Sequence, residues 1–184
     1  MTNRAQQEAM AKPTRVFMDI SADAEPIGRL VFELNTKVCP KTSENFRRLC
    51  TGEMGFGYKG CHWYRIIPGF CACSGDFETQ NADRRGGRST FDTKYFDDEN
   101  HDIYHSKRGI LSMDNFGWPN TNSSRFFVTF DYTPWMDKFH VAFGELVDGF
   151  DVLDKMESYG TIEGYGAQKG RTTKLVVTEN CGVL

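Results

Sequence analysis

An arginine precedes an apolar run near the middle of the chain, and two cysteines follow that run on alternate positions. Arg65 is followed by Ile-Ile-Pro-Gly-Phe at residues 66–70, and then by Cys71 and Cys73. A guanidinium is always charged and offers several N–H donors. Arg65 could therefore bind a polar group that is held beside an apolar surface. If residues 71 and 73 belong to a strand, both thiols face the same side of it.

The two thiols leave three interpretations open. They are packing substitutions without special chemistry, a redox-sensitive pair in which Arg65 lowers a thiol pKa, or part of a metal site. A metal site is disfavoured because Cys-x-Cys alone supplies too few ligands. A direct Cys71–Cys73 disulfide would be strained, since alternate strand residues lie about 6.6 Å apart, near the upper limit for bridging. The chain has six cysteines, which in a chain of this length do not imply a disulfide framework.

Taken one at a time, the other candidate residues favour ordinary structural roles. An arginine that flanks a strand is usually a solvated charge, and aromatic residues usually belong to the core. His140 stands between Phe139 and Val141, where a packed or surface histidine is the common case. These residues indicate chemistry only if they fall on one pattern together.

Length and charge narrow the class of protein. The 184 residues make one domain with a sizeable core. The net charge of −3 argues against a general basic field for nucleic acid. No run reaches the ~18 apolar residues of a membrane helix. Residues 1–13 lack the apolar core of a secretory signal, so we expect a flexible tail, a domain over residues 14–184, and a cytoplasmic or nuclear location.

Positioning Arg65 and the thiols requires strands on either side of them. Pro68 and Gly69 make a turn between two short strand-like runs, and a long polar surface loop is expected over residues 78–100. Alternating or apolar runs predict strands at 15–20, 29–34, 62–67, 70–74, 109–113, 126–130, 141–147 and 173–179.

Two segments predict helices. Residues 40–52 begin with Pro40 and end with Gly52, as helices commonly do. Phe46, Leu49 and Cys50 share one face of this helix and should cover a core. A second short helix is expected over residues 148–158. About eight antiparallel strands avoid exposed edges by closing into a barrel, so the expected fold is mainly β, a closed eight-stranded antiparallel barrel with two helices.

Several long strings, in order and correctly spaced, resemble the cyclophilin family. The resemblance runs from about residue 14 to the C-terminus and implies a closed eight-stranded barrel capped by two helices. It also implies peptidyl-prolyl cis-trans isomerase activity and cyclosporin binding, with no cofactor or metal and a monomeric state. The strings are FELNTKVCPKTSENFRRLCTGEMGFGYKG at 32–60, YRIIPGFCACSGDF at 64–77, FDDEN at 96–100, GILSMDN at 109–115, PNTNSSRFFVT at 119–129 and WMDKFHVAFGEL at 135–146.

Isomerisation of an X–Pro bond needs neither a nucleophile nor a metal. The amide rotates slowly because resonance gives its C–N bond double-bond character. An enzyme must bind the twisted amide better than either planar form. Twisting returns a lone pair to the prolyl nitrogen, so a donor placed there is worth more in the transition state than in the ground state. By resemblance, Arg65 is that donor.

The resemblance also assigns the surroundings of the proline ring. Phe70, Phe127, Met136 and His140 would build the pocket and its wall, with Arg65, Phe70, Phe127 and His140 as the catalytic set. Asn115 would bind the substrate backbone. Trp135 would lie at the rim, where the family contacts cyclosporin through its indole N–H. The implied partners are proline-containing peptides and unfolded proteins.

The chain departs from the family pattern at the site itself. Cys71 and Cys73 replace a methionine and a glutamine, and the glutamine normally steadies the arginine. Asp114 and Phe116 replace alanines, Arg125 replaces a glutamine, and Trp118 is an insertion. All except Trp118 are predicted to bind substrate. Asp114 and Arg125 could pair with each other or with Arg65.

These departures predict weakened or narrowed isomerase activity and reduced cyclosporin affinity. Two alternatives remain open. The groove could be a proline-peptide binding module without useful turnover, or Cys71 and Cys73 could make the protein thiol-regulated.

Overall fold

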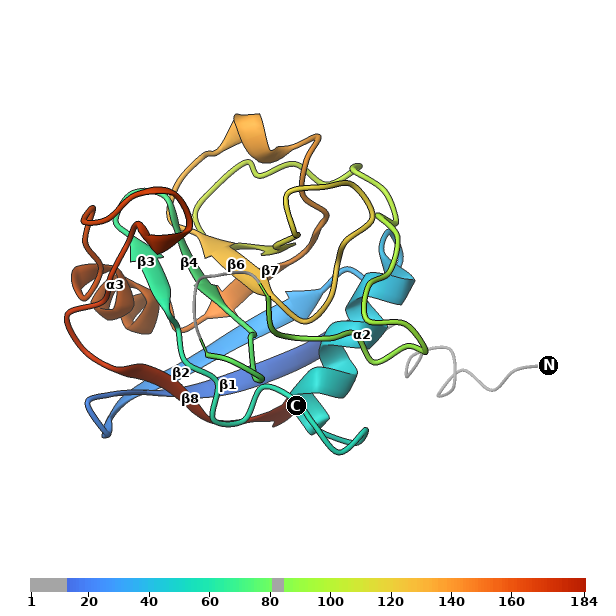
Figure 1. Ribbon diagram of the computed structural model, residues 1–184. Coiled ribbons are helices and arrows are strands. Elements are labelled where there is room, and N and C mark those ends of the chain that lie inside the picture. Colours follow the sequence, from blue (N-terminus) through green and yellow to red (C-terminus); the bar gives the residue numbers. More distant parts are fainter. Residues whose placement is uncertain (1–12, 81–84) are drawn as a thin grey trace.

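The computed structural model describes residues 13–80 and 85–184 (Figure 1). The predicted tail, apart from Pro13, and residues 81–84 of the predicted loop lie outside the described residues. No helix in the described ranges is long and apolar enough to cross a membrane. The strands are β1 (Thr14–Ala22), β2 (Glu25–Leu34), β3 (Arg65–Ile67), β4 (Cys71–Ser74), β5 (Ile110–Met113), β6 (Phe126–Thr129), β7 (Ala142–Asp148) and β8 (Val176–Val183).

All eight strands form one antiparallel sheet in the order β3-β4-β6-β5-β7-β2-β1-β8. The sheet is a half-barrel that stays open between β3 and β8, so the prediction of a closed barrel is wrong in that respect. Strand β3 has only three residues, and the segment before it meets β8 outside any regular strand, at an isolated bridge between His62 and Val177. Backbone hydrogen bonds over residues 60–63, such as that of 2.8 Å from Trp63 to Val176, make this contact. The strand count was visible in the sequence, but the pairing of the two edges was not.

The helices form where their end signals stand. Helix α2 (Pro40–Thr51) has Pro40 in its first turn and ends at Gly52, whose φ of 70° suits a residue without a side chain. Phe46, Leu49 and Cys50 are buried, which confirms the predicted face. Helix α3 (Phe150–Ser158) begins two residues later than expected, because Gly149 has a φ of 90° and lies outside the helix. Two short 3-10 helices, η1 (Pro134–Met136) and η2 (Gly166–Gln168), complete the elements.

An aromatic cluster fixes the sheet against α2. The ring of Phe46 on α2 has its centroid 5.0 Å from those of Tyr58 and Phe126, and 5.2 Å from that of Phe143. Burying such a side chain stabilises the fold by about 1.5–3 kcal/mol. Helix α2 packs on β1, β7 and β8, and α3 packs on β2 and β3 (Figure 1). Strands β3, β4, β5 and β6 are thereby held as a rigid support for the side chains on their other face.

Candidate active site

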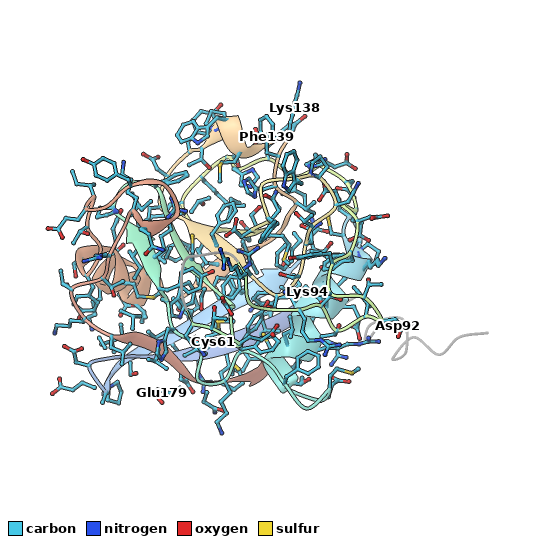
Figure 2. The ribbon with its side chains drawn as sticks, viewed as in Figure 1. Cys61, Asp92, Lys94, Lys138, Phe139 and Glu179 are labelled. Carbon is cyan, nitrogen blue, oxygen red and sulfur yellow. The ribbon has the colours of Figure 1, made fainter. Side chains whose placement is uncertain are left out.

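A groove of about 440 Å³ opens beside β3, β4 and β6 and contains most of the predicted site residues. Its other wall comes from the loop between β5 and β6 and from η1 with the residues that follow it. Lys138 and Phe139, two of these following residues, are labelled at the top of the molecule in Figure 2. The lining residues are Arg65, Phe70, Cys71, Cys73, Asp98, Asp114, Asn115, Gly117, Trp118, Pro119, Phe127, Trp135, Met136, Lys138, Phe139 and His140.

Arg65 is the first residue of β3 and lies opposite Cys73 of β4 in the strand register. Its side chain is partly buried, and its Nε has no hydrogen-bond partner among the described residues. A buried donor of a charged group without a partner costs free energy. A ligand that accepts a hydrogen bond in the groove would remove that cost.

Strand β4 places both thiols on the groove side, as alternation predicts. Cys71 and Cys73 are buried and line the groove, whereas Ala72 between them belongs to the main core. The two sulfur atoms are 3.8 Å apart and share a hydrogen bond. Together with Phe127, they form a small apolar cluster separate from the main core.

The pKa of Cys71 lies well above its ordinary value. The hydrogen bond with Cys73 raises it most and burial raises it further, while the positive charge of Arg65 acts in the opposite direction without overcoming them. The interpretation in which Arg65 produces a low thiol pKa is therefore wrong for Cys71. Its thiol is protonated and neutral at physiological pH.

Apolar side chains make the floor and one wall of the groove. Phe127 on β6 is buried opposite Cys73, and Met136 of η1 packs on the same cluster. Phe70 stands at the turn before β4, with its ring centroid 6.0 Å from that of Trp135. Trp135 itself is 60% exposed and lies at the rim. A rigid apolar pocket therefore adjoins the guanidinium of Arg65, as the resemblance implied.

His140 is oriented by the backbone of β5. Its Nδ1 lies 2.9 Å from the carbonyl oxygen of Met113, which can only accept, so Nδ1 carries the proton in the neutral ring. The ring packs edge-on against Phe127, with centroids 5.1 Å apart and planes at 88°. His140 thus closes the pocket on the side away from Arg65's strand.

A second histidine, which was not among the predicted site residues, lies behind Phe127. His105 is fully buried, with Nδ1 2.8 Å from the carboxylate of Asp137 and Nε2 2.8 Å from Oγ of Ser112. Because a carboxylate only accepts, Nδ1–H donates to Asp137, and Nε2 of the neutral ring accepts from Ser112. The pKa of His105 is lowered from its ordinary value, and burial is the largest cause. The ring stacks on Phe127 at 15° and 5.8 Å, and so ties β5, β6 and the end of η1 together.

The loop after β5 is held by its own side chains. Nδ2 of Asn115 donates to the carbonyl of Phe139 at 2.8 Å, and Oδ1 accepts from the N–H of Gly117 at 2.9 Å. These two bonds fix the orientation of the amide, and the predicted contact of Asn115 with the substrate backbone stays a prediction. Asp114 lines the groove, and its Oδ1 accepts from the N–H of Asn115 at 2.9 Å.

Arg125 and Phe116 do not line the groove, contrary to the prediction that they bind substrate. Arg125 is 1% exposed, and none of its guanidinium nitrogens has a hydrogen-bond partner in the described part of the chain. Its guanidinium lies 6.0 Å from the ring centre of Phe116. The predicted pairing of Asp114 with Arg125 or Arg65 is also absent between these described residues. Arg125 and Phe116 were assigned to the groove from their positions in the sequence, which do not show the direction in which a long side chain points.

The structure therefore brings ten of the twelve predicted residues to one groove and adds others. Asp98, Lys138 and Phe139 also line the groove. Each belongs to a sequence string that resembles the cyclophilin family, and this resemblance could have predicted their place in the groove. A second hollow of about 610 Å³ lies elsewhere, near Leu34 and Tyr104, and contains none of the predicted site residues. No cluster of three or more His, Cys, Asp or Glu side chains suited to a metal ion occurs within residues 13–80 and 85–184.

Comparison with protein families agrees with this geometry. The family model described as cyclophilin type peptidyl-prolyl cis-trans isomerase/CLD matches residues 17–183. The match spans all of the sheet except the first three residues of β1, and it covers both α-helices and every residue of the groove. Within the described residues, the Nε of Arg65 has no hydrogen-bond partner and lies beside the apolar side chains of the groove. The chain belongs to the cyclophilin-type peptidyl-prolyl cis-trans isomerase family, and it is an isomerase of X–Pro peptide bonds.

Proposed function

We propose that the groove isomerises X–Pro bonds in peptides and unfolded proteins, with Arg65, Phe70, Phe127 and His140 as its catalytic residues. The observation that carries this assignment is the buried Nε of Arg65, which has no hydrogen-bond partner among the described residues at the edge of an apolar pocket. The proline ring would rest on Phe127 and against Phe70. The guanidinium would donate to the prolyl nitrogen as the amide twists.

The energetics of that donation favour the twisted state. In the planar amide the nitrogen lone pair is delocalised, so the nitrogen is a poor acceptor. At the twisted geometry the lone pair is localised, and a hydrogen bond to a charged donor contributes about 1.5–3 kcal/mol. Since each 1.4 kcal/mol changes the rate tenfold, this one contact accounts for about 10- to 150-fold acceleration. The rigid pocket adds to this by holding the ring still while the rest of the peptide rotates.

We also propose that activity is weaker than in family members with a glutamine at the position of Cys73. A thiol is a weak hydrogen-bonding group, and Cys73 is already bonded to Cys71. It therefore cannot hold the guanidinium of Arg65 in one orientation as a glutamine amide can. The guanidinium is then less well held in the position from which it would stabilise the transition state.

Reduced cyclosporin affinity is proposed for the same reason. Trp135 is exposed at the rim and available to a ligand. The floor beneath it differs from the family pattern at Cys71 and Cys73, and Trp118 and Asp114 change the facing wall. A ligand that fits the common groove would lose contacts on both sides.

A cytoplasmic or nuclear location and a monomeric state complete the proposal. All six cysteines are free thiols, and five are buried, a usage typical of proteins in reducing compartments. Regulation by oxidation of Cys71 is not supported, because its raised pKa leaves little of the thiolate that oxidants attack. The altered neighbours of Arg65, above all Cys73, are the one observation that favours a proline-peptide binding module, which is the second candidate function.

The test is an exchange experiment on a short X–Pro peptide. Two-dimensional NMR exchange spectroscopy gives the cis–trans rate with and without the protein, and chemical-shift changes of the peptide report binding separately. We expect acceleration at catalytic protein concentrations. Binding without acceleration would overturn the proposal and leave a proline-peptide binding module. A catalytic efficiency and a cyclosporin affinity equal to those of a family member with methionine and glutamine at positions 71 and 73 would refute the weakened activity.

A further inference from the structure

The two thiols on the groove floor form a preorganised pair. The sulfur atoms of Cys71 and Cys73 are 3.8 Å apart, and theirs is the one hydrogen bond between two cysteine side chains among the six cysteines, all of which are described. Both side chains line the groove and leave 3% and 4% of their surface exposed. Their backbone is fixed on both sides, because β4 pairs with β3 and with β6. A reagent that bonds to two sulfurs at once would therefore meet them already in position.

A disulfide is a poor use of this pair. Its formation needs an oxidant and a thiolate, and the raised pKa of Cys71 keeps the thiol protonated. Alternate residues on a strand are about 6.6 Å apart at Cα, close to the limit of about 6.8 Å for an unstrained bridge. The pairing of β4 on both edges opposes the backbone movement that would relieve this strain.

A metal ion is also disfavoured. Metal ligation requires deprotonated sulfur, and the two thiols have no third or fourth His, Cys, Asp or Glu in suitable position among the described residues. The permanent positive charge of Arg65, opposite Cys73 in the register, would repel a cation. The pair therefore suits an electrophile that is neutral, bonds to two sulfur atoms and needs no oxidant.

We propose that Cys71 and Cys73 form a dithiol binding site for neutral trivalent arsenicals of the arsenoxide class, R–As=O. Two As–S bonds form while the As=O bond is lost, and the two thiol protons leave with the oxygen as one water molecule. Arsenic stays trivalent and sulfur is not oxidised. The product R–As(S-Cys71)(S-Cys73) carries no charge, so neither burial nor Arg65 opposes it.

The groove also supplies a place for the organic substituent. Phe70, Phe127 and Met136 pack around the two sulfurs, and the groove holds about 440 Å³. An apolar cavity of about 150 Å³ is enough for a benzene ring. A phenyl group on arsenic can therefore occupy the region proposed for the proline ring. Competition with X–Pro peptide follows; this competition rests on the proposed function, whereas the binding itself does not.

The experiment uses phenylarsine oxide with the full chain. Intact-mass spectrometry should show one phenylarsenic group per chain, removed by excess 2,3-dimercaptopropanol but not by the same concentration of a monothiol. Because the second As–S bond forms within the protein, we expect binding about 10²–10⁴-fold tighter in the wild type than in Cys73→Ser or Cys71→Ser. Cys181→Ser, which alters a partly exposed thiol outside the groove, should bind as the wild type does.

Controls keep the result interpretable. Each variant is checked for native folding by its NMR amide spectrum, and two single variants are used so that the loss of one to misfolding leaves the other. Undiminished binding in a folded Cys71→Ser or Cys73→Ser variant would overturn the proposal. An adduct on Cys39 or Cys181 would also overturn it. Tight binding to the pair without inhibition of peptide exchange would retain the dithiol site and instead contradict the placement of the isomerase reaction in this groove.

Discussion

Removing the imidazole of His105 should destabilise the protein and loosen the wall of the groove. In His105→Leu, the carboxylate of Asp137 loses its side-chain donor and keeps the backbone N–H of residue 105, which donates to Oδ1 at 2.6 Å. The buried hydroxyl of Ser112 loses its acceptor. A hydrogen bond to a charged group contributes about 1.5–3 kcal/mol and a neutral one about 0.5–1.5 kcal/mol, so the free energy of unfolding should fall by about 2–4 kcal/mol. The melting temperature of a domain of this size should then fall by about 4–16 °C.

Urea denaturation followed by tryptophan fluorescence measures this loss. His105→Asn is the matched control, because its amide N–H can replace Nδ1–H toward Asp137 while the bond from Ser112 is lost. We expect about a third of the destabilisation in that variant, because only the weaker, neutral hydrogen bond is lost. A change of less than about 0.5 kcal/mol in His105→Leu, the range of an ordinary surface substitution, would refute the reasoning.

The same histidine gives a pH dependence of known sign. Its pKa is lowered in the folded protein, whereas it is about 6.5 in the unfolded chain. Below about pH 6.5 the unfolded chain binds more protons, so this contribution to stability is present above that pH and is lost as the pH falls through the folded pKa. The difference in unfolding free energy between wild type and His105→Leu should therefore shrink below pH 6.5, by at most about 1.4 kcal/mol per pH unit. A difference that grows on acidification would contradict this assignment.

Three further predictions test other parts of the structure. Arg125→Met should leave the free energy of unfolding unchanged or raise it by about 1–3 kcal/mol, because the buried guanidinium has no hydrogen-bond partner among the described residues; a loss above 1 kcal/mol in urea denaturation would reveal a partner. Glu157→Ala should lower it by about 1–3 kcal/mol, since this carboxylate accepts from the backbone N–H of Gly69 at 2.7 Å and from Arg108 at 2.9 Å, and calorimetry showing no change would contradict this role. Trp135→Ala should weaken cyclosporin binding, measured by titration calorimetry. It should change the free energy of unfolding by no more than about 0.5 kcal/mol, because the indole is largely exposed; unchanged affinity would place the ligand elsewhere.

Local signals in the sequence predicted most of the fold. Pro40 and Gly52 predicted the limits of α2 to within a residue, because end signals act through the backbone of their own turn. Alternation predicted that Cys71 and Cys73 share a face. The last strand was placed at 173–179 but runs over Val176–Val183. Its position depends on pairing with β1, a partner about 160 residues away, and a single strand's composition carries no information on that register.

The site residues also fall into those that the sequence predicted correctly and those that it did not. Arg65 and Phe127 were predicted from the chemistry of the X–Pro amide and from the family resemblance, and both line the groove. Arg125 and Phe116 were placed in the groove on the same resemblance, but the direction of a long side chain depends on the space around it. His105 was missed because its partners, Ser112 and Asp137, come from separate elements and meet only in the folded chain.

The most direct measurement is the cis–trans exchange rate of an X–Pro peptide with wild type, Arg65→Ala and Arg65→Lys. Arg15→Ala serves as the control, since Arg15 forms an exposed ion pair with Glu33 far along the sheet. We expect kcat/KM to fall by about 10²-fold in Arg65→Ala, as for loss of one transition-state donor, and less in Arg65→Lys, with no change in Arg15→Ala. Exchange in a folded Arg65→Ala protein as fast as in the wild type would show that Arg65 is not the donor and that the reaction takes place without it.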